Sequence, residues 1–327
     1  MTAFRWQDGE RLIVFGRGRI AEAGELLGSA YALLTTPRAR TAAPAVVSGA
    51  EIVLDVPLGR VDELATALRS ERHDGELFVA LGGGRVIDVA KALAAAEPPR
   101  RVAAIPTTLS GAEMTAIHRH AAGVPTDTAR VRPALVINDP DLSASQPLPE
   151  LAASAANALG HALEAPLTTL SNPVAELAAA EAARQIASGL FRSEADRDAL
   201  ALGALLAGYA IGSAGYGLHH VLAQTLARFA GIGHGAANAV MLPHSLAALT
   251  RRFPGRITRL GEAIGRNPLA IAVHVRDLSG TTRLRDVSVS AQQLDQCADH
   301  AAARAELHLT PPAADRDELR ALYGLAW

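Results

Sequence analysis

The sequence predicts a two-part fold, an α/β domain with a parallel, Rossmann-like sheet followed by an all-α domain. Over residues 1–145, short apolar runs alternate with helical patterns. After Pro140 the pattern changes: alanine- and leucine-rich helical segments dominate, and no convincing strand follows. Alternating strands and helices are typical of a parallel sheet covered by helices. We therefore expect an α/β domain over 1–145 and an α-helical domain over 146–327.

The predicted strands of the first domain are short apolar runs that end at turn residues or prolines. These runs are residues 31–36, 51–56, 77–81, 101–105 and 134–138. Helical patterns cover residues 61–70 and 86–96. The segment after Pro37 holds no full helix before the strand at Glu51, so the first β–α unit is shortened.

Composition favours a globular protein of the cytoplasm. The chain has 327 residues, 49% hydrophobic and 20% charged, which suffices for two domains and a large core. A net charge of −2 gives no reason to expect nucleic acid or an anionic membrane as a partner. The single cysteine, Cys297, excludes an internal disulfide framework and fits a reducing compartment. The first ten residues are polar and lack the apolar core of a secretory signal.

One uncharged segment, residues 199–217, has about the length of a transmembrane helix. It contains five glycines and runs directly into His219 and His220. Small residues allow helices to pack closely, which favours a buried central helix over a membrane span. On this interpretation His220 closes a long apolar helix.

A glycine turn marks a candidate phosphate site. Gly82, Gly83 and Gly84 follow a predicted strand and open a helix, where backbone N–H groups attract anions. The loop after the next strand carries three hydroxyl side chains, those of Thr107, Thr108 and Ser110. A tight turn without a ligand and simple turn-forming hydroxyls are the alternatives. Two such loops at the carboxyl edge of one sheet favour a nucleotide site.

A second candidate site combines an amide with histidines. Asn157 and His161 lie four residues apart, on one face of a helix. His220 follows on another helix, and His234 stands between two glycines that suit a sharply turned backbone. We expect the three histidines to share a pocket, although each can also be structural. An aspartate at 157 would complete a convincing set of metal ligands, whereas three histidines with an asparagine leave metal binding open.

These motifs together resemble the group III, or iron-containing, alcohol dehydrogenase family, which has the dehydroquinate synthase-like fold. Within it, the maleylacetate reductase branch is the most similar. The resemblance spans residues 31–246. Its landmarks are Thr35-Thr-Pro, Gly82-Gly-Gly, Ile105-Pro-Thr-Thr, Asn172-Pro173, Gly217-Leu-His-His, His234-Gly and Leu242-Pro-His244.

The resemblance implies an NAD(P)H-dependent oxidoreductase that transfers hydride to an unsaturated keto acid. Gly83 and Gly84 would hold the cofactor pyrophosphate, with Thr107 and Thr108 nearby. The family's metal ligands, an aspartate and three histidines, fall here on the following positions: Asn157, His161, His220 and His234. The maleylacetate reductase branch also has asparagine first, which implies a reductase that works without a metal. If a metal is bound, its ligands are the three histidines.

The resemblance also implies roles for single residues and a homodimeric assembly. His220 and His234 would polarise the substrate carbonyl and move protons, while His161 would help to hold the substrate. Arg130 or Arg132 would bind a substrate carboxylate, and the alternative is that both are solvated loop charges.

Some positions depart from the family pattern. Gln224 stands where the family has a further active-site histidine, and an amide donates hydrogen bonds but does not exchange protons. Asp55 stands where the branch often has histidine, and the usual basic stretch is reduced to residues 126–130. Three hypotheses follow: a metal-independent NAD(P)H reductase, a metal-dependent alcohol dehydrogenase, and a non-redox member such as a lyase, cyclase or binding protein.

Overall fold

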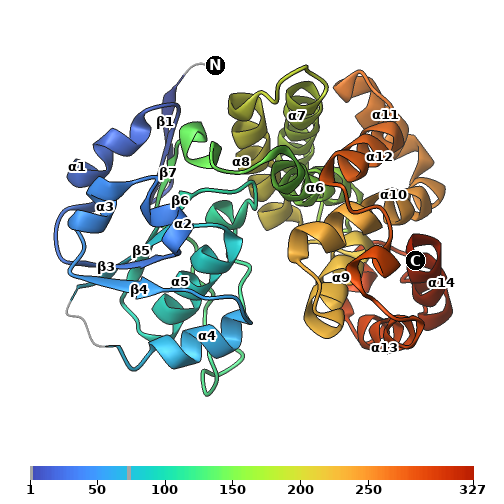
Figure 1. Ribbon diagram of the computed structural model, residues 1–327. Coiled ribbons are helices and arrows are strands. Elements are labelled where there is room, and N and C mark those ends of the chain that lie inside the picture. The colour runs from blue at the N-terminus through green and yellow to red at the C-terminus, as the bar shows by residue number, and fades with distance from the viewer. Residues whose placement is uncertain (1–2, 72–74) are drawn as a thin grey trace. The chain divides into compact units, whose positions relative to one another are not determined.

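The computed structural model describes residues 3–71 and 75–327, and it divides into two compact units, Met1–Gln146 and Pro147–Trp327 (Figure 1). Residues 1–2 and 72–74, which the predicted α/β domain includes, lie outside the described residues. The first unit holds a seven-stranded sheet in the order β1-β2-β7-β6-β5-β3-β4. Its strands are β1 Phe4–Asp8, β2 Arg11–Phe15, β3 Tyr31–Thr35, β4 Ile52–Asp55, β5 Leu77–Gly82, β6 Arg101–Pro106 and β7 Leu135–Asn138.

Helices cover both faces of this sheet, which explains its buried apolar strands. One core cluster joins the sheet to α4 and α5, and another joins it to α1, α2 and α3. The helices are α1 Ala23–Leu27, α2 Pro37–Arg40, α3 Pro44–Ser48, α4 Val61–Leu68 and α5 Gly84–Ala96. Short 3₁₀ helices lie at η1 Arg19–Glu22, η2 Ala112–Met114 and η3 Pro140–Ser143. The predicted strands and helices are therefore present, with α2 and α3 as short helices in the shortened first unit.

The N-terminal hairpin of β1 and β2 is not among the strands predicted from the sequence. β1 pairs antiparallel with β2, and β2 continues the parallel sheet by pairing with β7. The turn is tight, since Asp8 pairs with Arg11 and Gly9 has a φ of 61°. The two loop residues are Gly9 and Glu10, and a two-residue loop that begins with glycine is a recognised hairpin signal, so the local sequence did carry this information.

The second unit is helical throughout. All of residues 147–327 are described, and no strand occurs among them. The α-helices are α6 Leu148–Glu164, α7 Pro173–Leu190, α8 Arg197–Ala214, α9 Leu218–Thr225, α10 His234–Arg252, α11 Pro254–Ile264, α12 Pro268–Ser279, α13 Ala291–Ala302 and α14 Arg316–Ala326. Shorter elements are η4 Ala165–Leu167, the π-helix η5 Leu226–Ala230, η6 Leu284–Val287 and η7 Ala305–Leu309. The predicted fold class, an α/β unit followed by an all-α unit, is confirmed.

Helix α6 is the centre of this unit. It packs against α7, α8, α9, α10 and α12, and most of its residues are buried. Because α6 carries Asn157 and His161, the residues around these two side chains come from several helices that lie far apart in the sequence. The fold thereby gathers polar groups inside an otherwise apolar helical layer.

The predicted long helix that ends at His220 is wrong. Helix α8 ends at Ala214, and Gly215 follows with a φ of 68°, a conformation that glycine adopts without a steric penalty. A new helix, α9, begins at Leu218, so His220 lies in its first turn. Within residues 3–71 and 75–327, no single helix is long and apolar enough to cross a membrane; one pair bent by 106°, α8 with Leu218–Ala230, passes by length and composition only.

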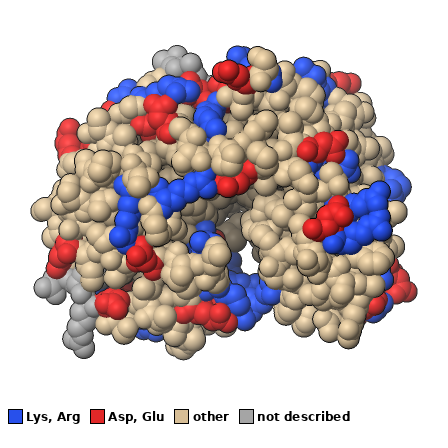
Figure 2. All heavy atoms as spheres, viewed as in Figure 1, with Lys and Arg blue, Asp and Glu red and all other residues tan. Residues whose placement is uncertain are grey.

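Acidic and basic side chains are interspersed over the face of the molecule in Figure 2. This distribution agrees with the net charge of −2. The face shown therefore offers no broad single-sign field for a polyanion.

Candidate active site

The glycine turn, Gly82–Gly84, lies at the carboxyl edge of the sheet. Gly82 is in register with Pro106, so the loops after β5 and β6 are neighbours. Gly83 is the N-cap of α5, and no side chain caps this helix start. The first N–H groups of the helix therefore remain available to an anion.

The hydroxyl loop, Thr107–Ser110, packs tightly against this turn. A Cβ atom on Gly83 would lie 3.0 Å from Cγ2 of Thr108, and one on Gly84 would lie 2.9 Å from Cβ of Ser110. The Thr107 N–H donates to the Gly82 carbonyl at 3.0 Å and ties the two loops together. Glycine is thus required for this close approach. An uncapped helix start beside a hydroxyl-bearing loop fits a dinucleotide pyrophosphate.

The imidazole site, defined as Asn157, His161, His220 and His234, assembles three helices of the second unit. Asn157 and His161 lie on α6, His220 on α9 and His234 at the start of α10. The His161 and His220 rings stack with centroids 4.5 Å apart, and His234 Nε2 lies 3.1 Å from Asn157 Oδ1. The structure therefore brings together the four residues that the sequence singled out.

A close helix contact sets the position of His234. A Cβ on Gly235 would lie 3.2 Å from Cβ of Ala153 on α6, so glycine lets α10 begin against α6. Asn157 and His220 are almost fully buried, His161 is half-buried and His234 is exposed. The site thus has a buried inner part and a side that solvent reaches through His234.

Glu164 is a site residue that the sequence analysis missed. It ends α6, and its Oε2 lies 2.7 Å from Nδ1 of His220. Its Oε1 accepts the backbone N–H of His219 at 2.6 Å. A carboxylate only accepts hydrogen bonds, so His220 carries its proton on Nδ1 and its Nε2 holds a lone pair. The available signal was spacing, since Glu164 lies seven residues after Asn157 and three after His161.

Burial keeps these rings neutral. It lowers the pKa of His220 to about 3 and holds the pKa of His161 well below its ordinary value. Burial also raises the pKa of Glu164, while the neighbouring His219 and backbone N–H groups oppose this rise. Two ring nitrogens, Nδ1 of His161 and Nε2 of His220, are buried and have no hydrogen-bond partner within the described chain. Neutral rings with unpartnered nitrogens are ready to bind a polar ligand group.

A second buried network, also missed by the sequence analysis, supports the site from behind. His219 contacts Oγ of Ser245 through Nδ1 at 2.8 Å and Oδ1 of Asn238 through Nε2 at 3.1 Å. The Asn238 amide donates to the His234 carbonyl at 2.8 Å. Because Asn238 Oδ1 accepts, His219 carries its proton on Nε2 and its Nδ1 accepts from the Ser245 hydroxyl. This chain links α9 to the first turn of α10, where His234 lies.

Gln224 faces a different polar group. Its Oε1 accepts from Nη2 of Arg304 at 3.2 Å. Arg304 also donates to the Tyr216 hydroxyl at 3.0 Å and pairs with Glu306 at 2.8 Å. The hydrogen bond from Arg304 lowers the pKa of Glu306 to about 2, so this pair is ionised at neutral pH. Tyr216 connects the group to the imidazole site, since its ring centroid lies 5.8 Å from that of His220.

The remaining predicted residues lie in the first unit. Arg130 and Arg132 are exposed on the loop before β7. Asp55 ends β4 at the carboxyl edge and forms an ion pair with Arg40 of α2. Neither arginine is part of the glycine turn or the hydroxyl loop, and their predicted role in binding a carboxylate stays a prediction.

The donor set of the imidazole site does not fit a metal ion in this arrangement. Within the described ranges, no three His, Cys, Asp or Glu side chains are placed to hold an ion. Nε2 of His234 donates to Oδ1 of Asn157, so this nitrogen carries a proton and has no lone pair for an ion. Asn157 also adds no charge to offset that of a divalent ion. We therefore derive no chemical step through a metal.

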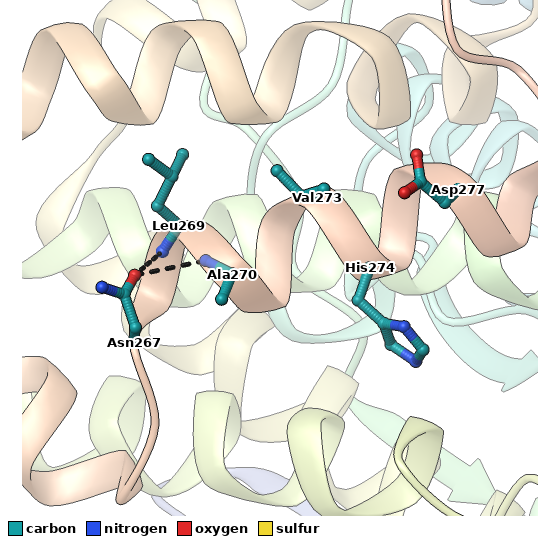
Figure 3. A pocket seen from close by; sticks show the side chains of 6 residues that line it. All are labelled: Asn267, Leu269, Ala270, Val273, His274 and Asp277. Carbon is teal, nitrogen blue, oxygen red and sulfur yellow. Dashed lines mark hydrogen bonds between the residues drawn. The ribbon is translucent and has the colours of Figure 1, made fainter.

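A surface cavity elsewhere on the second unit offers no comparable chemistry (Figure 3). Its lining comes from α12 and the residue that caps it: Asn267, Leu269, Ala270, Val273, His274 and Asp277. The Asn267 side chain accepts the N–H groups of Leu269 and Ala270, which accounts for it as a helix cap. None of the imidazole-site residues lines this cavity.

This two-unit fold carries a glycine turn suited to a pyrophosphate and a cluster of neutral imidazoles. That combination is typical of a class of dehydrogenases. The chain belongs to the iron-containing alcohol dehydrogenase family. The model described as "Iron-containing alcohol dehydrogenase" matches residues 11–140, and "Fe-containing alcohol dehydrogenase family, C-terminal" matches residues 151–327. The protein is an NAD(P)-dependent oxidoreductase with a small-molecule substrate. The resemblance inferred from the sequence motifs is confirmed.

Similar proteins of known function indicate the branch of this family to which the chain is most similar. Maleylacetate reductase 1 of Rhodococcus opacus is 33% identical over 285 residues, which cover 84% of this chain and 78% of that protein. Maleylacetate reductase 2 of Cupriavidus pinatubonensis is 36% identical, covering 77% and 76%. The crystal structure of maleylacetate reductase from Agrobacterium tumefaciens has a TM-score of 0.81 at 27% identity, covering 100% of this chain and 98% of that chain. The chain is a reductase of this type.

Proposed function

We propose that this protein reduces an unsaturated keto acid, of the kind represented by maleylacetate, with NAD(P)H and without a metal ion. The observation that carries the proposal is the stacked pair His161 and His220. Each presents a buried, unpartnered ring nitrogen, and position 157 of the same site holds an asparagine in place of an aspartate. The similarity to several maleylacetate reductases supports the choice of substrate class.

The glycine turn and the hydroxyl loop bind the cofactor. The uncapped N–H groups at the start of α5 would hold the pyrophosphate, and the close contact of Gly84 with Ser110 limits the space beside this helix start. When bound, NAD(P)H supplies the hydride. The role of the protein at this turn is to hold the cofactor in place and to exclude bulk water.

The imidazole site stabilises the charge that the hydride creates. Hydride addition to the electrophilic carbon places negative charge on the substrate carbonyl oxygen, which must accept a hydrogen bond or a proton. His161 is the candidate donor. The single N–H of the neutral His234 ring already donates to Oδ1 of Asn157. Glu164 holds His220 with a lone pair on Nε2, so this ring accepts a hydrogen bond from substrate or water rather than donating one. Asn157 holds His234 at 3.1 Å.

The proposal extends to the cellular compartment and the assembly of the enzyme. The single cysteine, Cys297, is buried in α13, and burial raises the pKa of its thiol to about 11, so it remains a protonated thiol at neutral pH. A buried, protonated thiol is consistent with a reducing compartment. We propose a cytoplasmic homodimer, in line with the family resemblance, and Arg130 or Arg132 as the group that binds a substrate carboxylate.

Calorimetric titration with NADH and NADPH, followed by cofactor oxidation in the presence of maleylacetate, tests the proposal. We expect micromolar cofactor binding and turnover by protein that elemental analysis shows to be free of stoichiometric iron and zinc. Activity that appears only after iron or zinc is added would favour a metal-dependent alcohol dehydrogenase instead. Absence of any cofactor binding would overturn the redox function and favour a lyase, cyclase or binding protein.

A further inference from the structure

Lys91 is a fully buried lysine on α5, two turns after the glycine turn. Its side chain is 0% exposed. A buried ammonium group is unfavourable unless it is paired and hydrogen-bonded, so its partners show what it holds. The catalytic scheme above makes no use of this residue.

The partners of Lys91 are consecutive turns of the segment that continues the hydroxyl loop. Its Nζ donates to the carbonyls of Ala112 at 3.0 Å, Thr115 at 3.2 Å and Ile117 at 2.8 Å. Asp88, one turn earlier on α5, lies 2.7 Å away and balances the charge. An ammonium group has three N–H donors, so these contacts saturate it. It has no donor left for a ligand, which excludes direct contact with a cofactor as its role.

The position of this segment decides whether the hydroxyl loop closes on the glycine turn. At its start the loop is tied to the sheet, because the Thr107 N–H donates to the Gly82 carbonyl. At its end it is tied to α5, through Lys91 and the carbonyl of Ala112. Gly111, with a φ of 69°, makes the sharp turn between the two anchors. The intervening residues are therefore held at both ends against Gly83 and Gly84.

We propose that Lys91 is a positioning residue for the cofactor, which clamps segment 112–117 to α5 so that Thr108 and Ser110 stay packed against the glycine turn. The inference rests on the proposed cofactor role of that turn. Lys91 touches neither cofactor nor substrate, yet it sets the affinity for NAD(P)H through the position of segment 112–117. The opposing side of the segment is held similarly, since Arg11 donates to the carbonyl of Glu113 at 3.1 Å.

The test compares two Lys91 variants with a matched control in the full-length protein. Lys91→Met removes the ammonium and keeps a similar apolar volume. Lys91→Gln keeps two N–H donors without the charge and serves if the methionine variant does not fold. Val89→Ala, on the same helix and 0% exposed, lies in the apolar core and lowers stability without removing any hydrogen bond to segment 112–117. Dissociation constants for NADH and NADPH are measured by fluorescence titration, and thermal stability is measured in parallel.

We expect Lys91→Met to raise the dissociation constant about tenfold or more, and Lys91→Gln to raise it by less. In Val89→Ala the constant should stay within about twofold of wild type at a similar loss of melting temperature. At saturating cofactor, kcat of the Lys91 variants should remain close to wild type, because the imidazole site contains none of the partners of Lys91. A lysine with a purely structural role would not raise the dissociation constant of the cofactor while leaving kcat unchanged.

Two results would contradict the inference, and they are distinguishable. If wild type binds NAD(P)H and both Lys91 variants bind it equally well, or lose affinity only in proportion to Val89→Ala, the clamp is refuted and the proposed function stands. If wild type itself gives no binding signal with either cofactor, the proposed function fails and the inference fails with it.

Discussion

The carboxylate of Glu164 lies 2.7 Å from Nδ1 of His220 and accepts the backbone N–H of His219 at 2.6 Å. One buried side chain at the end of α6 thereby fixes both the tautomer of His220 and the first turn of α9. This contact explains why a histidine that follows a glycine-rich break presents Nε2 in a defined direction. It also identifies a substitution that changes the tautomer of His220 without replacing any residue of the imidazole site.

Glu164→Gln should lower kcat by roughly 10- to 100-fold, the usual effect of removing a carboxylate that orients a functional histidine. The amide can donate to Nδ1 and so stabilise the opposite tautomer of His220. Steady-state kinetics at saturating NAD(P)H would measure the change. The dissociation constant of the cofactor is the control and should not move, since Glu164 lies in the second unit. A kcat within twofold of wild type would show that the tautomer of His220 is unimportant.

The buried histidines predict that the protein loses stability as the pH falls. Burial lowers the pKa of His219 and of His220 from about 6.5 to about 3. Between these values the unfolded chain binds protons that the folded chain does not, so the free energy of unfolding decreases as the pH falls below 6.5. Urea unfolding at pH 7.5, 6.0 and 5.0 should show a progressive loss. His219→Gln should reduce this slope by about one proton, and an unchanged slope would count against the buried neutral state.

Gly84→Ala should weaken cofactor binding because its Cβ would lie 2.9 Å from Cβ of Ser110. Either the hydroxyl loop or the helix start must shift, and we expect about a tenfold increase in the NAD(P)H dissociation constant, or about 1.4 kcal/mol. Gly24→Ala in α1 is a matched control, because its Cβ would meet nothing within 4 Å. That change should leave binding intact and stabilise the fold by up to about 1 kcal/mol. Equal affinities in both variants would remove the glycine turn from the cofactor site.

Asn157→Asp should create affinity for a divalent ion. The substitution supplies a carboxylate beside the three imidazoles, which strengthens the site for iron or zinc. Elemental analysis after expression with added metal should find substoichiometric metal in wild type and close to one equivalent in the variant. Asn157→Ala is the control and should remain metal-free. Stoichiometric metal in wild type would contradict the proposed metal-independent reaction.

Local sequence patterns predicted much of the secondary structure. Apolar runs bounded by glycine and proline predicted the strands β3 to β7 near their observed bounds, because strand formation depends on short-range polarity and turn chemistry. The same reasoning failed at α8, where an uncharged run was extended through Gly215 to His220. A hydropathy pattern gives no sign that one glycine adopts a positive φ. Because α8 ends before Gly215, His220 belongs to the next helix, α9. The hairpin at Asp8 and Gly9 was missed although its turn signal is local.

Spacing and residue type were enough to predict the two-unit architecture, the glycine turn and the cluster of Asn157 with the histidines. The partners of the buried polar groups, in contrast, follow from the packing of the folded chain. Glu164 meets His220, and Lys91 meets the carbonyls of segment 112–117, through contacts between elements that are distant in sequence. Burial makes every such partner obligatory, but which partner is available depends on how helices and loops pack, and that packing is not encoded in any local pattern.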